Sequence, residues 1–512
     1  GSHMMNITRV QPRVFNPAFV PIAVTAVLIT AMALIAPDTM TAAARTFSTR
    51  FMARWDVMYV NTFSILVVAV FAIAFSPLGR IRIGGVDAVA EFSRTTWIGM
   101  IFSGAMGGSL IGFSVYQPLE HLQHARLLFE GGANEQATAN ALAIYMWGFH
   151  GWGPWSLLAA AFAYASYNRS DAFGFKGIAD VVIPAPYPKS RTFLAGISDY
   201  AGIVSCWFSS SVGLALITQQ VAGGLIDSFQ LGATTKMLAP VVSVVMAACF
   251  VAVALTGLKS GIGRLSRYNF ILAHLFLATV FLLCNPTELL WGLGSSVVAY
   301  GKLLFTLPFI LTGAQDEAVR AFRLVWPASY MLWWLGMSVI ISAYFAKISY
   351  GRTVREVLLV ITVVPTALIA LWFGVMGNAA AAILEQAPQL FEDLSASQAV
   401  YTFLNQLPAG DAFAGFVLLL SALFLITTGA PMIYVLAEFM YESVTTPSRG
   451  TILLWGVALG TTVTVVSAQS GITAMQELAI SVSIPFSFVY LALMIAFLAR
   501  IALDRLRRVS EE

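Results

Sequence analysis

The sequence predicts an all-α protein that crosses a membrane many times, and three observations support this prediction. Hydrophobic residues make up 58% of the 512 residues and charged residues 10%, whereas soluble domains carry about 25% charged residues. Apolar runs long enough to span a bilayer recur along the chain. The Lys and Arg residues gather in alternate connections between these runs, as in polytopic membrane proteins.

The chain begins with residues 1–4, which read as the remnant of an expression tag, so we expect Met5 to be the native start. No small-residue cleavage pattern follows the first apolar run, and we therefore expect no cleaved signal peptide. Residues 5–95 form an N-terminal region with two spans.

Twelve apolar runs are expected to cross the membrane. The region 286–327 is also apolar but is interrupted by Gly and Pro, so we expect a helix lying at the interface there rather than a thirteenth span. The twelve runs lie near residues 17–36, 57–76, 96–117, 138–166, 196–226, 237–257, 268–285, 328–348, 356–379, 412–440, 449–469 and 478–503.

The distribution of cationic residues predicts the orientation. With a cytoplasmic N-terminus, the cytoplasmic segments hold 20 of the 28 Lys and Arg residues and the outer loops hold 8. The positive-inside rule therefore places both termini in the cytoplasm. The outer loop 380–411 agrees, because it carries acidic residues and no cation.

Glycines in the third span indicate a broken helix. Gly104, Gly107 and Gly108 weaken helical structure near mid-membrane, and carbonyls freed at that depth bind cations well. The alternative is close helix packing through small residues, and the glycines alone do not separate the two.

Three tryptophans fall in the fourth span, which we expect to be one helix. At about 100° per residue, Trp155 lies about 80° and Trp152 about 140° around from Trp147, so the three share one broad face. Several indole faces together bind an organic cation, such as a quaternary ammonium or sulfonium group. The alternative is an aromatic belt at the lipid headgroups, but these residues lie in the middle third of 138–166.

The eighth span holds a second aromatic pair, Trp333 and Trp334, followed by Gly336 and Met337. Because the pair lies only a few residues into the run, anchoring at the membrane interface is the alternative to a role in the same site. A compact basic turn ends this span at residues 347–356.

The sequence offers little for catalysis. Cys206, Cys249 and Cys284 fall in apolar runs and are expected to be small core residues. His150 has no carboxylate or cysteine near it in sequence, so we expect a neutral, hydrogen-bonded histidine and no enzyme or metal site. The net charge of +3 gives no argument for nucleic acid.

These stretches, in order and with similar spacing, resemble the betaine/choline/carnitine transporter family. The likeness runs from about residue 56 to 440. It is carried by the glycine-rich third span ending in Gln117-Pro118-Leu119, by Trp147-Gly-Phe-His-Gly-Trp-Gly-Pro-Trp155, by Gln220-Val-Ala-Gly-Gly-Leu225, and by Trp333-Trp334 followed by Ile348-Ser-Tyr-Gly-Arg-Thr-Val-Arg355.

The resemblance implies a sodium-coupled symporter with the LeuT-like fold, a homotrimer in the bacterial inner membrane. Two extra N-terminal helices would precede two inverted five-helix repeats, residues 96–285 and 328–503, with the substrate between them at mid-membrane. The tail, 504–512, is too short for the long basic helix with which family members sense osmotic stress, so such regulation is not expected.

Matching positions imply a substrate site. Trp155 stands where the family usually has Tyr, and Met337 where many members have another Trp, so one wall of the box is altered. Gln117 also departs from the family's frequent Glu-Pro. The implied substrate residues are Trp147, Trp152, Trp155, Trp333, Trp334, Met337 and Met106.

The resemblance also implies a sodium site. Thr427 and Thr428 follow Phe424 as in the family's Phe-x-x-Thr-Ser pattern, and their hydroxyls would bind Na⁺ together with carbonyls of Ser103 and Met106. The alternative is that the threonine hydroxyls bond to carbonyls of their own helix.

A second family sodium site corresponds to Cys206 and Ser210, with Gly213 nearby. Because a thiol is a poor ligand for Na⁺, we expect one well-formed sodium site and doubt the second. Lys and Arg are absent from the three predicted spans that carry these sites, 96–117, 196–226 and 412–440, which argues against a cation that replaces sodium.

The expected function is Na⁺-coupled symport of a betaine, choline, carnitine or dimethylsulfoniopropionate type of solute, with no cofactor beyond the coupling ion. The expected partners are the solute, Na⁺ and membrane lipids. Alternatives are a sodium-independent exchanger of trimethylammonium compounds, a carrier for another zwitterionic solute, or a solute-gated sensor or channel.

Overall fold

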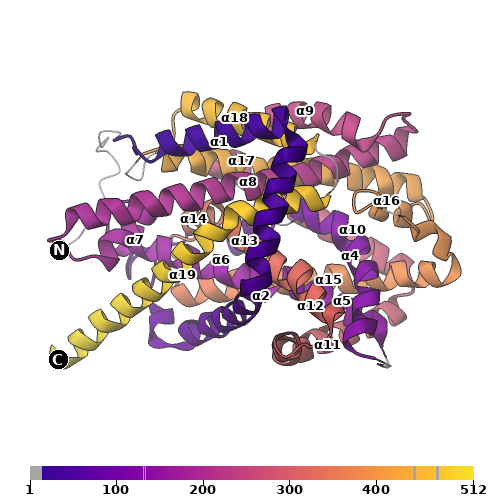
Figure 1. Ribbon diagram of the computed structural model, residues 1–512, viewed down its shortest axis with the longest axis horizontal. Helices are drawn as coiled ribbons and strands as arrows, with labels where there is room; N and C mark the ends of the chain where they lie inside the picture. The colour runs from indigo at the N-terminus through magenta and orange to yellow at the C-terminus, as the bar shows by residue number, and fades with distance from the viewer. Residues whose placement is uncertain are drawn as a thin grey trace.

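The computed structural model describes residues 14–105, 107–130, 132, 134–393, 395–441, 446–468 and 472–511. Within these ranges the chain is helical almost throughout and forms no β-strand, only two isolated bridges. Figure 1 shows α1, α8, α9, α17 and α18 running across the picture as a stack, with α2 crossing in front of them. The predicted all-α polytopic class is confirmed.

The first half of the chain carries ten α-helices, with short 3₁₀ or π turns at Pro77–Arg80, Ala165–Arg169 and Leu258–Gly263. The helices are α1 (Phe19–Ile35), α2 (Pro37–Phe75), α3 (Arg94–Ala105), α4 (Gly107–Leu128), α5 (Glu135–Trp147), α6 (Phe149–Tyr164), α7 (Phe175–Val182), α8 (Pro188–Phe229), α9 (Thr235–Leu255) and α10 (Arg264–Leu283).

The second half continues in the same way, with short turns at Leu324–Ala328 and Pro388–Phe391. Its helices are α11 (Pro286–Thr312), α12 (Glu317–Arg323), α13 (Ser329–Gly336), α14 (Ser338–Ile348), α15 (Val354–Gln386), α16 (Ala399–Leu404), α17 (Gly410–Phe439), α18 (Arg449–Ser467) and α19 (Ile472–Glu511). Each predicted span lies on one helix or on two helices separated by a break.

Three spans are broken, and the sequence predicted one of these breaks. The third span divides into α3 and α4, which are bent by 63°, as the glycines indicated. The eighth divides at Met337, where α12–α13 and α14 are bent by 56°. The prediction of one helix through Trp147 and Trp152 is wrong, because Gly148 (φ −94°, ψ −129°) separates α5 from α6.

The glycines of the third span also allow close packing. A Cβ at Gly104 would overlap the ring of Tyr344 on α14, and one at Gly107 would overlap the ring of Phe424 on α17. Both interpretations of these glycines therefore hold, since the helix breaks there and its two halves pack tightly against α14 and α17.

The expected interfacial region contains α11, a single helix of 27 residues, so the Gly and Pro residues of this stretch do not interrupt it over 286–312. By length and composition α11 is also able to cross a membrane. It packs on α5 and α15, and in Figure 1 it is seen close to end-on at the lower edge, whereas α8 and α17 run across the picture. Its position at the interface stays a prediction.

Buried ion pairs fix both ends of the broken eighth span. Arg323 on α12 binds Asp56 on α2 at 2.8 Å, and Lys347 on α14 binds Glu438 on α17 at 2.5 Å. Breaking such a pair leaves an uncompensated buried charge at a cost of about 3–5 kcal/mol, so these pairs hold the segment in place.

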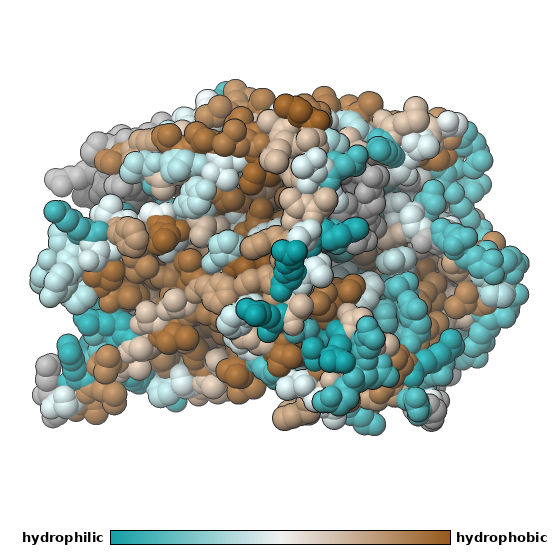
Figure 2. Space-filling view, viewed as in Figure 1, coloured by the Kyte–Doolittle hydropathy of each residue, from teal (hydrophilic) through white to brown (hydrophobic). Residues whose placement is uncertain are grey.

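The outer surface is apolar in the manner of a membrane protein. Figure 2 shows hydrophobic residues over most of the visible face, with hydrophilic residues gathered toward its right end and left edge. Val68, Val457 and Ile495 are 68%, 67% and 70% exposed. In Figure 1, α1 begins and α19 ends on the left, so both lie at the same end of the molecule.

Candidate solute and sodium sites

The four central tryptophans form one cluster although they come from three helices. The ring centroids of Trp147 and Trp334 are 5.1 Å apart, those of Trp152 and Trp155 are 5.1 Å apart, and those of Trp155 and Trp334 are 6.2 Å apart. All three pairs meet edge to face. The break at Gly148 therefore still allows the tryptophans of α5 and α6 to converge on α13.

Hydrogen bonds from the indole N–H groups hold these rings in place. Trp155 donates to the carbonyl of Trp334 at 2.7 Å, and Trp334 donates to the carbonyl of Met146 at 2.6 Å. The buried Nε1 of Trp152 has no partner among the described residues, and its ring stacks on Phe345 with centroids 6.1 Å apart. The N–H of Trp147 is likewise engaged, with Gln117. Trp147, Trp155 and Trp334 can therefore offer a ligand their aromatic faces but not an N–H donor.

The second pair of tryptophans joins the same cluster. Trp333 stacks on Trp334 with centroids 4.8 Å apart and planes inclined by 15°. Both side chains are 2% exposed, and Trp147, Trp152 and Trp155 are 0% exposed. A lipid-facing aromatic belt requires exposed rings, so neither group of tryptophans forms one.

A narrow cavity lies beside this cluster, between the α3–α4 break and the α13–α14 break. Its volume of about 20 Å³ is enough for about one water molecule, so a solute the size of betaine requires the surrounding side chains to move. Trp147, Trp152 and Trp155 do not line it. Its walls include Ala105, Ser109, Ser210, Gly213, Trp333, Trp334, Met337, Thr428 and Met432.

Gln117 orients one wall of the cluster, a role the sequence did not reveal. Its Oε1 accepts from Trp147 Nε1 at 2.7 Å and lies 3.4 Å from the hydroxyl of Tyr330. Its Nε2 lies 3.2 Å from His121 Nε2, which must accept. This assigns the His121 proton to Nδ1, which is 2.9 Å from His124 Nδ1. The amide of Gln117 is thereby fixed in one orientation.

The residues of the expected sodium site meet between α3 and α17. The Thr428 hydroxyl donates to the carbonyl of Ser103 at 3.2 Å. The Thr427 hydroxyl lies 3.3 Å from the carbonyl of Phe424 on its own helix and accepts from Asn269 Nδ2 at 3.2 Å. The structure thus realises both alternatives, with Thr427 bonded within its helix and Thr428 reaching across to the break.

These ligand atoms are buried. Ser103 and Thr427 are 0% exposed and Thr428 is 8% exposed. Met106, named for both the solute and the sodium site, lies outside the described residues. Three or more His, Cys, Asp or Glu side chains do not gather into a metal-binding group anywhere in the described part of the chain.

At the expected second sodium site, the thiol of Cys206 already has a hydrogen-bond partner. Cys206 Sγ lies 3.3 Å from the carbonyl of Met337, at the α13–α14 break, and 3.4 Å from Ser210 Oγ. Ser210 and Gly213 line the cavity. Cys206 is buried, and all three cysteines are free.

His150 agrees with its expected role. It is 2% exposed, its Nε2 lies 3.2 Å from Ser64 Oγ, and its ring packs on Tyr145 at 4.2 Å. The residues that sequence reasoning missed are Asn269, Tyr330 and Phe345. Asn269 is a polar residue inside an apolar run, which is a signal that was available; Tyr330 and Phe345 carry none.

Comparisons with known proteins show which family this chain resembles. The profile of the betaine/carnitine/choline family of transporters matches residues 17–505. The glycine betaine transporter OpuD of Bacillus subtilis is 28% identical over 486 residues, covering 94% of this chain and 93% of the relative. Glycine betaine transporter 1 of Vibrio parahaemolyticus is 26% identical, covering 88% and 86%. The betaine/ectoine transporter LcoP of Corynebacterium glutamicum is 26% identical, covering 84% and 69%.

Proposed function

We propose that this chain, which belongs to the betaine/carnitine/choline transporter family, imports a betaine-type quaternary ammonium zwitterion by symport with Na⁺. It is a multi-pass membrane transporter and not an enzyme. One observation carries the proposal: Trp333, Trp334 and Thr428 line the same cavity.

The aromatic side of this cavity suits the solute. A trimethylammonium group donates no hydrogen bond, and it is attracted to indole faces, most strongly where water is excluded. Trp334 lines the cavity while its N–H donates to the carbonyl of Met146. Widening the cavity by movement of Met337 or Met432, which are flexible and apolar, would admit the methylated head.

The polar side suits the ion. Hydroxyl and carbonyl oxygens are the hard ligands that a small cation prefers, and Thr428 on α17 already meets the carbonyl of Ser103 near the end of α3. An ion between them would hold α3 against α17. Because Ala105 on α3 and Thr428 on α17 both line the cavity, the ion would stabilise the walls to which the solute binds. Such reciprocal stabilisation is what coupling requires.

The names of relatives guide the choice of solute. Two of them are named as glycine betaine transporters and one as a betaine/ectoine transporter. We therefore rank glycine betaine first, and choline, carnitine, ectoine and dimethylsulfoniopropionate as the panel to compare with it. A thermal-shift screen over this panel would rank the solutes directly.

The test of sodium coupling is uptake of labelled betaine into proteoliposomes with an inward Na⁺ gradient, compared with an equal K⁺ gradient. Symport predicts accumulation above equilibrium with Na⁺ alone. Uptake that is indifferent to Na⁺ but stimulated by solute preloaded inside would instead identify an exchanger. Ion current without accumulation would identify a channel.

We further propose that the protein lies in the bacterial inner membrane with both termini in the cytoplasm, as its cationic residues predict. The start of α1 and the end of α19 lie at the same end of the molecule, which supports this arrangement. The homotrimer is likewise a proposal from the family resemblance, and light scattering of the purified protein tests it.

A further inference from the structure

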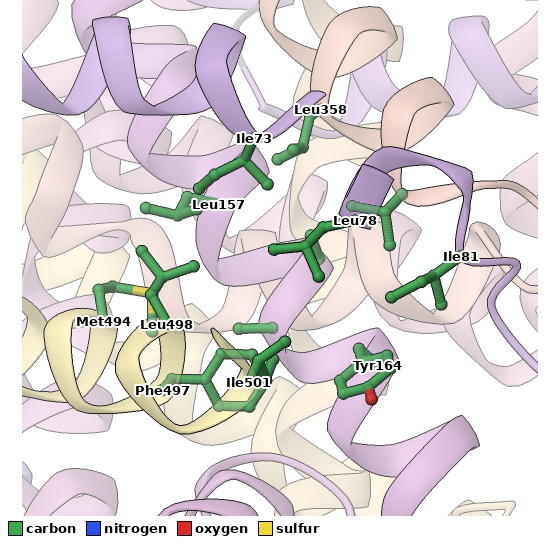
Figure 3. Close-up of a pocket in the computed structure, with 13 residues that line it drawn as sticks. Ile73, Leu78, Ile81, Leu157, Tyr164, Leu358, Met494, Phe497, Leu498 and Ile501 are labelled. Carbon is green, nitrogen blue, oxygen red and sulfur yellow. The ribbon is translucent and has the colours of Figure 1, made fainter. Parts of the chain in front are cut away.

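An apolar cleft separate from the solute cavity lies near the end of the molecule where α19 leaves the bundle. Figure 3 shows the side chains that converge on it from α2, the turn Pro77–Arg80, α6, α15 and α19. They include Ile73, Leu78, Leu157 and Leu498. Segments more than 400 residues apart in the chain therefore line one cleft, with a volume of about 40 Å³ that opens toward the surface.

The lining selects for hydrocarbon. Among the side chains that line the cleft, the hydroxyl of Tyr164 is the single oxygen or nitrogen group. The neighbouring residues Phe75 and Ile495 are 67% and 70% exposed, so the cleft is bordered by surface suited to lipid tails rather than to water. A polar ligand would find almost no partner inside.

One edge of the cleft is cationic. Arg80 follows the lining residue Leu78 by two residues and is exposed, and Arg355 directly follows the lining residue Val354, with its Cβ beside Gly79. Both arginines therefore come from segments that line the cleft. Arg355 donates to the carbonyl of Ala74, and within the described residues neither Arg80 nor Arg355 forms an ion pair. The nearby Glu356 already pairs with Arg94 and Arg352.

A second edge of the cleft, beside Tyr164, also has excess positive charge. Arg169 donates to the hydroxyl of Tyr164 at 3.3 Å and binds Asp504 at 3.1 Å. Arg500, which directly precedes the lining residue Ile501, binds the same carboxylate at 3.3 Å. Two arginines thus share one aspartate, and the two edges together carry four guanidinium groups against one carboxylate.

We propose that this cleft binds an acyl chain of an anionic phospholipid, whose phosphate is held by Arg80 and Arg355. An apolar channel bordered by unpaired guanidinium groups matches both halves of such a lipid, because arginine binds phosphate through paired N–H donors. The expected cytoplasmic position of this end agrees, since anionic lipids attract basic residues at the cytoplasmic ends of spans.

The test uses the full-length protein in nanodiscs of phosphatidylcholine that contain a trace of lipid with a photoreactive acyl chain. The reactive lipid carries either a phosphatidylglycerol or a phosphatidylcholine headgroup, and labelled peptides are identified by mass spectrometry. We expect the glycerol form to label the peptides containing 73–81 and 494–501 at least several times more than the choline form. Equal labelling by the two forms would overturn the proposal.

Two variants with matched controls locate the site. Leu498→Trp fills the half-buried mouth of the cleft and should remove most of the labelling, whereas Val457→Trp, on the exposed face of α18, should leave it unchanged. Arg80→Gln should reduce the preference for the glycerol headgroup, whereas Arg449→Gln, an exposed arginine at the start of α18, should not. Unchanged labelling in Leu498→Trp would overturn the site; if that variant does not fold, an unchanged headgroup preference in Arg80→Gln would do so.

Discussion

The two helix breaks of the core offer the same group, a backbone carbonyl, to different side chains. At the α3–α4 break the carbonyl of Ser103 faces the hydroxyl of Thr428, which comes from the unbroken helix α17. At the α13–α14 break the carbonyl of Met337 faces the thiol of Cys206, which comes from the unbroken helix α8. The contact distances are nearly equal, 3.2 Å and 3.3 Å.

The difference lies in the chemistry of the ligand atom. Hydroxyl oxygen is a hard donor that suits Na⁺, whereas thiol sulfur is soft and prefers copper, zinc or iron. Backbone geometry therefore prepares two places for an ion, and the side chains complete one of them. The comparison predicts a single coupling ion at the α3–α4 break.

Removing an aromatic wall of the cavity that joins the two breaks should have the largest effect. A desolvated cation–π contact is worth about 2 kcal/mol or more, so Trp334→Ala should weaken solute binding by about 30-fold, within a range of one to two orders of magnitude. Trp152→Ala, which removes a ring that does not line the cavity, tests whether the inner tryptophans contribute after the cavity widens. Binding of labelled betaine to purified protein measures both.

Trp334→Phe is the matched control for this prediction. It retains an aromatic face and removes the N–H that Met146 accepts, so its affinity should fall less than that of the alanine variant. Unchanged affinity in both Trp334→Ala and Trp152→Ala would mean that the solute binds elsewhere. The contacts at the two helix breaks would then be structural and unrelated to transport.

The variant Thr428→Ala directly tests the difference between the α3–α4 and α13–α14 breaks. A hydrogen bond or ligand contact to a charged group is worth about 1.5–3 kcal/mol, so the Na⁺ concentration for half-maximal uptake should rise at least tenfold. Thr427→Ala should have a smaller effect, because that hydroxyl is bonded within its own helix and to Asn269. A sodium curve that neither change alters would exclude this site.

Much of this arrangement was accessible from the sequence, and the reasons differ between its parts. The spans and the α3–α4 break are local, since a run of about 20 apolar residues and a group of glycines signal them directly. The break at Met337 has no such group of glycines before it. Only Gly336 precedes it, and a Cβ there would overlap Ser209 and Ser483 from two other helices, a contact that the local sequence does not reveal. The face of the tryptophans was right and the single helix beneath them wrong, because packing brought the rings together across Gly148.

The role of Gln117 could not be predicted for the same reason. Its replacement sharpens the comparison of the two breaks because it should change solute binding and leave the sodium dependence unaltered. Gln117→Leu leaves the indole N–H of Trp147 without its acceptor, a buried loss of about 1–3 kcal/mol that protein stability and solute affinity share. We expect solute affinity to fall severalfold while the sodium dependence stays as in the parent protein. Gln117→Glu is the control, because it keeps the acceptor and His121 can reverse its tautomer to donate.

The smallest expected effect is a gain, and it decides whether the ligand atom alone separates the two breaks. Cys206→Ser places a hydroxyl beside Ser210 and opposite the carbonyl of Met337, and this hydroxyl is the hard oxygen ligand that the second break lacks. Uptake should then depend more steeply on Na⁺ concentration, with a Hill coefficient rising from about 1 toward 2. Cys249→Ser, on α9 and outside this site, should leave the slope unchanged. A parent protein that already couples two ions, or a serine variant with an unaltered slope, would show that sulfur is not what distinguishes the α13–α14 break from the α3–α4 break.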